Sequence, residues 1–251
     1  MRTPIIAGNW KLNKTISEAV ALTTELRDLV AGSKGVEIVV APPFTALDAV
    51  SKVVNGSNIR LAAQDVYWED SGAFTGEVSV PMLKDIGCDY VIIGHSERRQ
   101  YFAETNQTVN QKVQAALSHN LKPILCVGEL LEEREAGHTE KVVESHVTGG
   151  IKGLIETELL SCVIAYEPVW AIGTGKTATP DQAQDVHKYI RDLITNTYSK
   201  DVASQICIQY GGSVKPENAA ELMTQPDVDG ALVGGASLNA ESFAQIVKHA
   251  L

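Results

Sequence analysis

Short apolar runs rich in β-branched residues recur along this 251-residue chain at a nearly constant interval. Eight stretches share this pattern: Ile5-Ala7, Val36-Ala41, Ile59-Ala63, Tyr90-Ile93, Pro123-Val127, Cys162-Tyr166, Ile206-Tyr210 and Ala231-Val233. Their starts lie about 32 residues apart on average, which is the length of one strand–helix unit. Within each run the apolar residues are continuous rather than alternating, as expected for parallel strands that are buried on both faces.

The segments between the runs carry apolar residues three or four positions apart, the spacing of one helix face. Over residues 17–30 this face contains Ala19, Leu22 and Leu26, and Ser17 is the expected N-cap. Further helices are predicted over residues 105–119 and from Pro180, Pro216 and Asn239 onward.

Eight strand–helix units in this length favour a (β/α)8 barrel, an α/β fold that forms a single domain over residues 1–251. An open, doubly wound sheet is the alternative. The barrel is favoured because the units number eight and no Pro/Gly/Ser-rich linker divides the chain.

Composition and charge narrow the functional classes. The formal net charge of −10 argues against a general binder of nucleic acid or anionic membranes, because phosphate groups need a basic face. No apolar run approaches the roughly 18–20 residues that span a bilayer, and residues 1–4 do not open a secretory signal. The four cysteines are far apart, which predicts buried thiols and a reducing, cytoplasmic location. They are Cys88, Cys126, Cys162 and Cys207.

Polar or glycine-rich residues follow the predicted strands, at the end where barrels of this kind build their sites. These stretches are Gly8-Asn9-Trp10-Lys11, Pro42-Pro43, Gln64-Asp65, Gly94-His95-Ser96-Glu97, Gly128-Glu129, Glu167-Pro168, Gly211-Gly212-Ser213 and Gly234-Gly235. A barrel brings these stretches together on one rim. The pattern therefore supports two interpretations equally: one shared functional site, or loop residues without a common function.

Two of these residues are candidates for acid–base chemistry. Glu167 precedes Pro168 and Trp170, whose apolar groups would desolvate its carboxylate and make it a stronger base. His95 directly precedes an expected helix start, where backbone N–H groups disfavour the imidazolium form. A capping role for either residue is the structural alternative.

Anion binding is indicated by Lys11 and by the glycines after the last two predicted strands. Gly211-Gly212-Ser213 and Gly234-Gly235 expose backbone N–H groups at the position where barrels often bind phosphate. Taken alone, Lys11 would be read as a solvated lysine, and glycine pairs also occur in ordinary tight turns.

Three further segments are distinctive. The stretch 170–177 ends in Gly-Lys-Thr but lacks the first glycine of a P-loop, so we interpret 168–178 as a lid over the site. The connection Gln64–Ser79 is long and aromatic, which predicts either packing on its own barrel or docking into a partner. The acidic stretch around Glu129 and Glu132–Glu135 is interpreted as a solvated helix face.

Taken together, the chain resembles the triosephosphate isomerase family over its full length. The matching stretches are Gly8-Asn9-Trp10-Lys11, Gly72-Ala73-Phe74-Thr75-Gly76-Glu77, Ile93-Gly94-His95-Ser96-Glu97-Arg98-Arg99, Cys126-Val127-Gly128-Glu129, the stretch from Ala165 to Ala178, Tyr210-Gly211-Gly212-Ser213-Val214 and Leu232-Val233-Gly234-Gly235-Ala236-Ser237-Leu238.

The resemblance implies an isomerase of glycolysis and gluconeogenesis. The reaction interconverts dihydroxyacetone phosphate and D-glyceraldehyde 3-phosphate through an enediolate, without cofactor or metal. The resemblance assigns Glu167 as the base, His95 as the electrophile and Lys11 as the cation, with Asn9 holding substrate. It assigns phosphate binding to Gly173, Ser213, Gly234 and Gly235, with Ser96 and Glu97 in support. It also implies a homodimer in which Thr75, on the loop Gln64–Ser79, reaches the neighbouring Asn9 and His95.

The residues themselves support less than the resemblance does. A glutamate–histidine pair without a nucleophile elbow or metal cluster fits proton abstraction next to a carbonyl. Two alternatives remain: a Schiff-base aldolase that uses Lys11, and a phosphometabolite sensor that has kept the fold.

Overall fold

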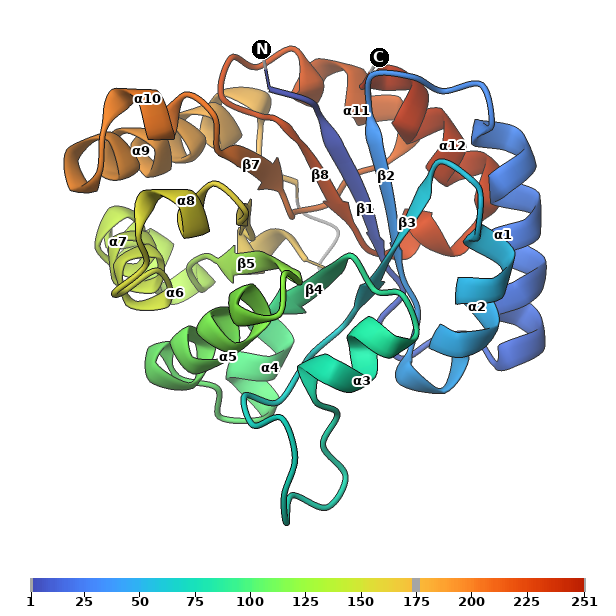
Figure 1. Cartoon of the computed structure of the whole chain (residues 1–251). Helices are drawn as coiled ribbons and strands as arrows, with labels where there is room; N and C mark the ends of the chain where they lie inside the picture. The colour runs from blue at the N-terminus through green and yellow to red at the C-terminus, as the bar shows by residue number, and fades with distance from the viewer. Residues whose placement is uncertain (1, 173–176, 251) are drawn as a thin grey trace.

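The computed structural model describes residues 2–172 and 177–250. Eight parallel strands follow one another around a closed barrel in chain order, and β1 pairs with both β2 and β8. Helices surround the strands, as Figure 1 shows. The predicted (β/α)8 barrel is confirmed, and the open doubly wound sheet is wrong.

The strands lie within two residues of the predicted runs. They are β1 Ile5–Asn9, β2 Glu37–Ala41, β3 Ile59–Ala63, β4 Tyr90–Ile93, β5 Lys122–Val127, β6 Val163–Tyr166, β7 Cys207–Tyr210 and β8 Gly230–Val233.

Twelve α-helices and three short 3-10 helices are present in the described part of the chain. The α-helices are α1 Ile16–Val30, α2 Leu47–Val54, α3 Val80–Asp85, α4 Ser96–Tyr101, α5 Asn106–Ser118, α6 Leu131–Glu135, α7 Thr139–Gly150, α8 Glu156–Leu159, α9 Pro180–Thr197, α10 Lys200–Ala203, α11 Pro216–Met223 and α12 Ala240–His249. The 3-10 helices are η1 Phe44–Ala46, η2 Val169–Ala171 and η3 Gly235–Leu238.

One predicted helix start is wrong. Thr15, rather than Ser17, precedes α1, and its backbone N–H donates to the Glu18 carboxylate at 2.8 Å. A carboxylate three residues after the cap satisfies a backbone donor that would otherwise lack a partner, so the helix begins earlier than its apolar face does.

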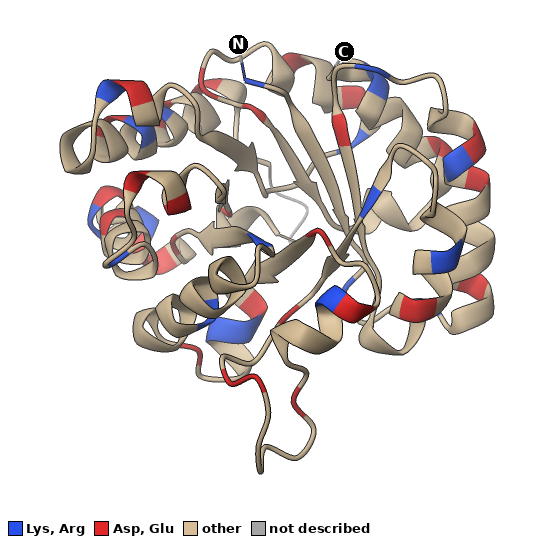
Figure 2. Cartoon of the chain, viewed as in Figure 1, with Lys and Arg blue, Asp and Glu red and all other residues tan. Residues whose placement is uncertain are grey.

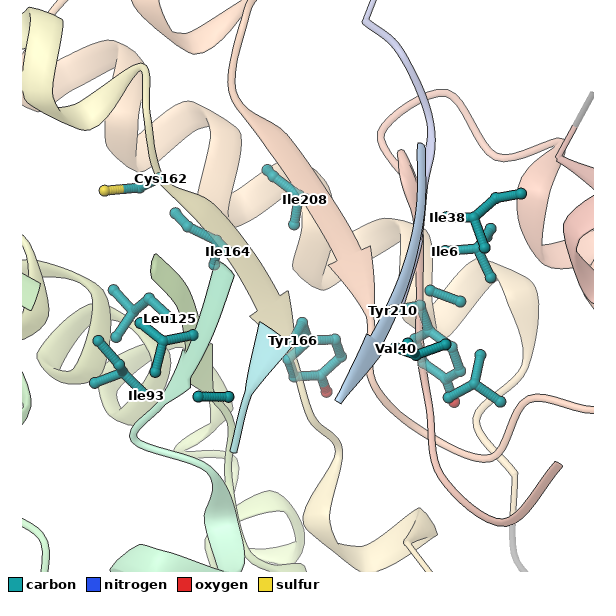
Figure 3. Close-up of a cluster of buried hydrophobic side chains, with 14 of the residues drawn as sticks. Ile6, Ile38, Val40, Ile93, Leu125, Cys162, Ile164, Tyr166, Ile208 and Tyr210 are labelled. Carbon is teal, nitrogen blue, oxygen red and sulfur yellow. The ribbon is translucent and has the colours of Figure 1, made fainter. Parts of the chain in front are cut away.

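Both faces of the strands are apolar, because each faces a different hydrophobic layer. Ile5 and Ala7 of β1 point into the barrel, whereas Ile6 packs toward the helices. Figure 3 shows this outer layer, in which Ile6 lies with Ile38, Ile164, Tyr166 and others. The two layers account for the continuous apolar runs in the sequence.

Of the four thiols expected to be buried, Cys88, Cys126 and Cys162 are buried, whereas Cys207 is partly exposed because it lies at the start of β7.

The segment 64–79 between β3 and α3 projects from the barrel, at the end opposite the two termini in Figure 1. Aromatic rings pack together within it: Tyr67 stacks on Trp68 at 4.1 Å and contacts Phe74 at 4.7 Å between ring centroids. Phe74 is still 41% exposed, so the loop carries an ordered but partly uncovered apolar surface.

A buried group of charges, here called the Lys112 cluster, ties this loop to α4 and α5. Lys112 Nζ pairs with Asp65 Oδ1 at 2.6 Å and with Glu104. Arg98 pairs with Asp65 Oδ2 at 2.9 Å and with Glu104 Oε1 at 2.5 Å. Two cations therefore neutralise two carboxylates, which buried charges require.

Most other charged residues belong to the outer helices, with acidic and basic positions interspersed (Figure 2). Within residues 2–172 and 177–250, no helix combines the length and the apolar character needed to cross a membrane.

Candidate active site

A cavity of about 400 Å³ opens at the carboxyl ends of the strands. Most of the site residues expected from the sequence line it: Asn9, Lys11, His95, Glu97, Glu167, Ser213, Gly234 and Gly235. Ser96 lines an adjacent cavity instead. Gly173, the remaining expected phosphate ligand, lies outside the described residues.

Glu167 follows β6 and is almost fully buried, with 2% of its surface exposed. Its backbone N–H donates to the Val127 carbonyl at 2.7 Å, which extends the β5–β6 pairing by one residue. Two glycines make room for it. A Cβ at Gly128 would lie 1.8 Å from the Glu167 carbonyl oxygen, and one at Gly211 would lie 2.9 Å from Glu167 Cγ.

Each oxygen of the Glu167 carboxylate has one partner at the start of α4. Oε2 accepts the Ser96 backbone N–H at 2.9 Å, and Oε1 lies 2.8 Å from His95 Nε2. His95 is the N-cap of α4, as its sequence position predicted, and its Nδ1 accepts the Glu97 backbone N–H at 3.2 Å. Because Nδ1 is an acceptor, the imidazole proton resides on Nε2, where it donates to Glu167.

These contacts set the protonation of the pair. Burial favours the neutral acid at Glu167, but His95 and the Ser96 N–H outweigh it and lower the pKa of the carboxyl. Burial also disfavours a charged His95, yet the adjacent carboxylate raises the pKa of this imidazole. The expectation that desolvation would raise the pKa of Glu167 is therefore wrong for this position of the side chain, because two donors lie within hydrogen-bond distance.

Lys11 lines the cavity near Glu97 and Gly234. Its Nζ pairs with Glu97 Oε1 at 2.7 Å, and its Cε would lie 3.6 Å from a Cβ at Gly234. The backbone of Lys11 has a positive φ of 52°. Asn9 Oδ1 and Gln64 Nε2 hold this strained turn through the Lys11 N–H at 3.0 Å and the Lys11 carbonyl at 2.9 Å. Gln64 was expected on the rim, but its role in supporting Lys11 was not predicted.

Residues after β7 and β8 form a further part of the cavity wall, here called the glycine wall: Gly211, Gly212, Ser213, Gly234 and Gly235. A Cβ at Gly212 would lie 2.2 Å from the Tyr210 hydroxyl, so only glycine fits there. Gly235 begins η3, which places a backbone helix start at the cavity. In the parts of the chain that the structure describes, no group of three or more potential metal ligands was found.

Glu129 corrects one expectation from the sequence. It was interpreted as part of a solvated face, but it is fully buried. Its Oε1 accepts hydrogen bonds from Tyr166 at 3.1 Å, Trp170 at 2.9 Å and Arg134 at 3.1 Å. Its position directly after a strand was the signal that could have predicted its burial.

The centre of the expected lid lies outside the described residues, so the lid stays a prediction.

Comparisons with known proteins agree with this geometry. Residues 4–250 match the family model described as triosephosphate isomerase. A triosephosphate isomerase of Pelobacter propionicus is 62% identical over 98% of both chains. Those of Moorella thermoacetica and Trichlorobacter lovleyi are 61% and 60% identical, each over 99% of both chains. The chain therefore belongs to the triosephosphate isomerase family, and it catalyses the glycolytic interconversion of dihydroxyacetone phosphate and D-glyceraldehyde 3-phosphate.

Proposed function

We propose that Glu167 and His95 perform the proton transfers of this isomerase reaction, while Lys11 and the glycine wall hold the phosphate. The observation that carries the proposal is the contact between a buried carboxylate and a histidine Nε2 beside a cavity of about 400 Å³. A base that removes a proton next to a carbonyl, and a donor that polarises that carbonyl, are what enediolate formation needs.

Glu167 must leave its observed position to act. Both of its oxygens accept from α4, and these donors lower the pKa of the carboxyl. A movement into the cavity would remove both donors but keep the side chain buried. Desolvation would then dominate and raise the pKa, which makes the carboxylate a stronger base at the moment it meets the substrate carbon.

The same movement frees His95. Its Nε2–H, which now faces Glu167, would donate to the substrate carbonyl oxygen. The Glu97 N–H bond to Nδ1 would keep the imidazole neutral, and loss of the Glu167 carboxylate would lower its pKa. A neutral imidazole can both donate a proton and accept one, so it can move protons between the two substrate oxygens.

Phosphate binding is assigned to Lys11 and the glycine wall. Lys11 supplies a cation, and Ser213, Gly234 and Gly235 supply backbone N–H groups, with no side chain at the two glycines to block the phosphate. Asn9 orients substrate and supports the Lys11 backbone. Gly173 remains part of the proposal from the resemblance alone.

We further propose a cytoplasmic homodimer formed through the loop Gln64–Ser79. Support comes from the projecting loop in Figure 1 and from the exposed ring of Phe74. Thr75 would then reach Asn9 and His95 of the second subunit.

Replacing Glu167 by Gln tests the central role. The neutral amide cannot take the proton, so kcat is expected to fall by several orders of magnitude while phosphate still binds. The exposed Glu156→Gln is the matched control and should keep full turnover. Turnover of E167Q within about tenfold of the parent, or roughly 1.4 kcal/mol in barrier, would refute the role.

That the reaction proceeds without a covalent intermediate on Lys11 is tested by borohydride trapping. A Schiff base on Lys11 would leave a covalent adduct with the carbonyl substrate, whereas proton transfer by Glu167 leaves none.

A further inference from the structure

A second cavity, here called the rear cavity, borders Glu167 from another side. It has a volume of about 230 Å³ and lies among the ends of β4 and β5, α4 and α7. Glu167 lines both this cavity and the substrate cavity, and it alone does so among the residues that the structure describes. Its side chain therefore forms part of the wall that separates them.

Arg99 supplies a cation to the rear cavity. Arg99 donates from Nε to the Gly94 carbonyl at 2.8 Å, from Nη1 to Asn106 Oδ1 at 2.8 Å and from Nη2 to the Cys126 carbonyl at 3.5 Å. Within the described ranges it forms no ion pair, although a guanidinium offers five N–H donors. Some of these donors remain available to an acceptor in the cavity.

A neutral donor lies nearby. His146 Nδ1 accepts the Gly128 backbone N–H at 3.3 Å, so its proton is on Nε2. Burial, reinforced by Arg99, lowers the pKa of His146 to about 4, which keeps the ring neutral near pH 7. No described residue accepts from its Nε2–H.

Carboxylates border the same space. Glu167 lines the cavity in its observed position, and Glu133 lies on its wall with Oε2 accepting the Leu130 backbone N–H at 2.8 Å. An anionic ligand would be attracted by Arg99 but repelled by the carboxylates. A cationic ligand would be attracted by the carboxylates but repelled by Arg99. A neutral carboxamide avoids both penalties, because its oxygen accepts from Arg99 or His146 while its NH2 group donates to Glu167.

Most of the remaining wall is apolar, although Ser96 and Gln100 also line it. Cys126, Val127, Leu130 and Val169 line the cavity and offer contacts to the body of a small ring. Pockets of mostly apolar lining with a few polar groups are typical small-molecule sites.

We propose that the rear cavity binds small neutral molecules that combine one planar ring with a carboxamide, and that the occupant holds Glu167 in its observed position. The second part rests on the proposed role of Glu167 as a mobile base. A bound carboxamide donates an additional hydrogen bond to the Glu167 carboxylate in its observed position. This hydrogen bond must be broken before Glu167 moves. The substrate cavity stays open, so kcat should fall while KM changes little.

Binding is tested with three probes of the same shape on the full-length enzyme. Benzamide is neutral, benzoate is an anion and benzamidine is a cation. Titration followed by NMR or calorimetry should give a millimolar Kd for benzamide, as expected for so small a ligand, at least about threefold tighter than for either charged probe. Absence of benzamide binding, or equal or tighter binding of a charged probe, would overturn the proposal.

The location is tested with Leu130→Ala, which removes apolar contacts at the cavity wall. It should weaken benzamide binding at least about threefold, since part of the apolar surface is lost. Leu160→Ala is the matched control, because Leu160 is similarly exposed and lies outside the cavity. Equal benzamide affinity in the two variants would overturn the assignment to this cavity.

Inhibition is tested separately. Saturating benzamide should lower kcat at least about tenfold with KM nearly unchanged, and an unchanged kcat would overturn the hold on Glu167. The probe titrations and the Leu130→Ala comparison measure binding and need no turnover. Failure of the proposed function would instead appear as an active E167Q enzyme in the absence of any probe, so the two failures are distinguishable.

Discussion

His187 makes the folded chain sensitive to acid. It is fully buried on α9, with its ring 5.8 Å from Tyr166 and 6.3 Å from Tyr210. Nδ1 lies 3.1 Å from the Asp227 carbonyl oxygen, which can only accept, so Nδ1 carries the proton. Nε2 is a buried atom without a partner in the described chain. A second proton would therefore be buried without an acceptor.

The loss of folding free energy at acidic pH follows from the pKa of His187. Burial lowers the pKa of His187 to about 4, from an ordinary value of 6.5 in the unfolded chain. Because the folded pKa is the lower one, the unfolded chain binds the proton first as the pH falls. The free energy of unfolding is thus unaffected by His187 above about pH 6.5 and declines between about pH 6.5 and 4. Below about pH 4, His187 causes no further decline. At about pH 5 the loss from this one residue is about 2 kcal/mol per subunit.

Replacing His187 by Asn tests this reasoning. Asn keeps a donor for the Asp227 carbonyl but cannot titrate. Urea unfolding at about pH 7.5 and pH 5, at one protein concentration, should show that the pH-dependent loss shrinks by about 2 kcal/mol in the variant. His138→Asn is the control, because His138 is exposed in the folded chain as in the unfolded one. The same pH-dependent loss in H187N and the parent would refute the argument.

Three further predictions concern the site and its supports. Gly128→Ala should lower kcat at least about tenfold, because its Cβ would overlap the Glu167 carbonyl oxygen; steady-state kinetics near those of the parent would contradict this. Lys112→Met should destabilise the fold by about 3–5 kcal/mol in urea unfolding, because two buried carboxylates then share Arg98 as their one remaining partner cation in the Lys112 cluster; a loss below about 1 kcal/mol would contradict it. Deleting residues 67–74 should yield monomers in sedimentation, and a persisting dimer would refute the proposed role of the loop.

The barrel could be predicted because its strands satisfy two local conditions at once. Ile5 and Ile6 face different layers, so both must be apolar, and the run becomes visible without knowledge of its partners. The start of α9 was equally local, since Thr179 caps it and Pro180 opens it. Patterns that depend only on neighbours in the chain can be read directly from a sequence.

Glu129 and Glu167 show where local reading ends. Glu129 lies in an acidic stretch, but its burial depends on Tyr166 and Trp170, which are distant in sequence. Glu167 was expected to have a raised pKa from its apolar neighbours, yet the deciding donors come from His95 and Ser96 on another strand–helix unit. The chemistry of a carboxylate follows from its spatial partners, which spacing alone does not reveal.

The net charge of −10 raises a last question, because the substrate carries a phosphate. Charges farther away than about 8–10 Å are largely screened at physiological salt, so the interspersed charges on the outer helices in Figure 2 matter less than those in the cavity. There, Lys11 is paired with the half-buried Glu97. A partly exposed pair of this kind is worth about 0–1 kcal/mol, so exchanging Glu97 for a phosphate costs little. Attraction of the anion therefore depends on Lys11 changing partners and on the backbone N–H groups of the glycine wall, which carry no competing counter-ion of their own.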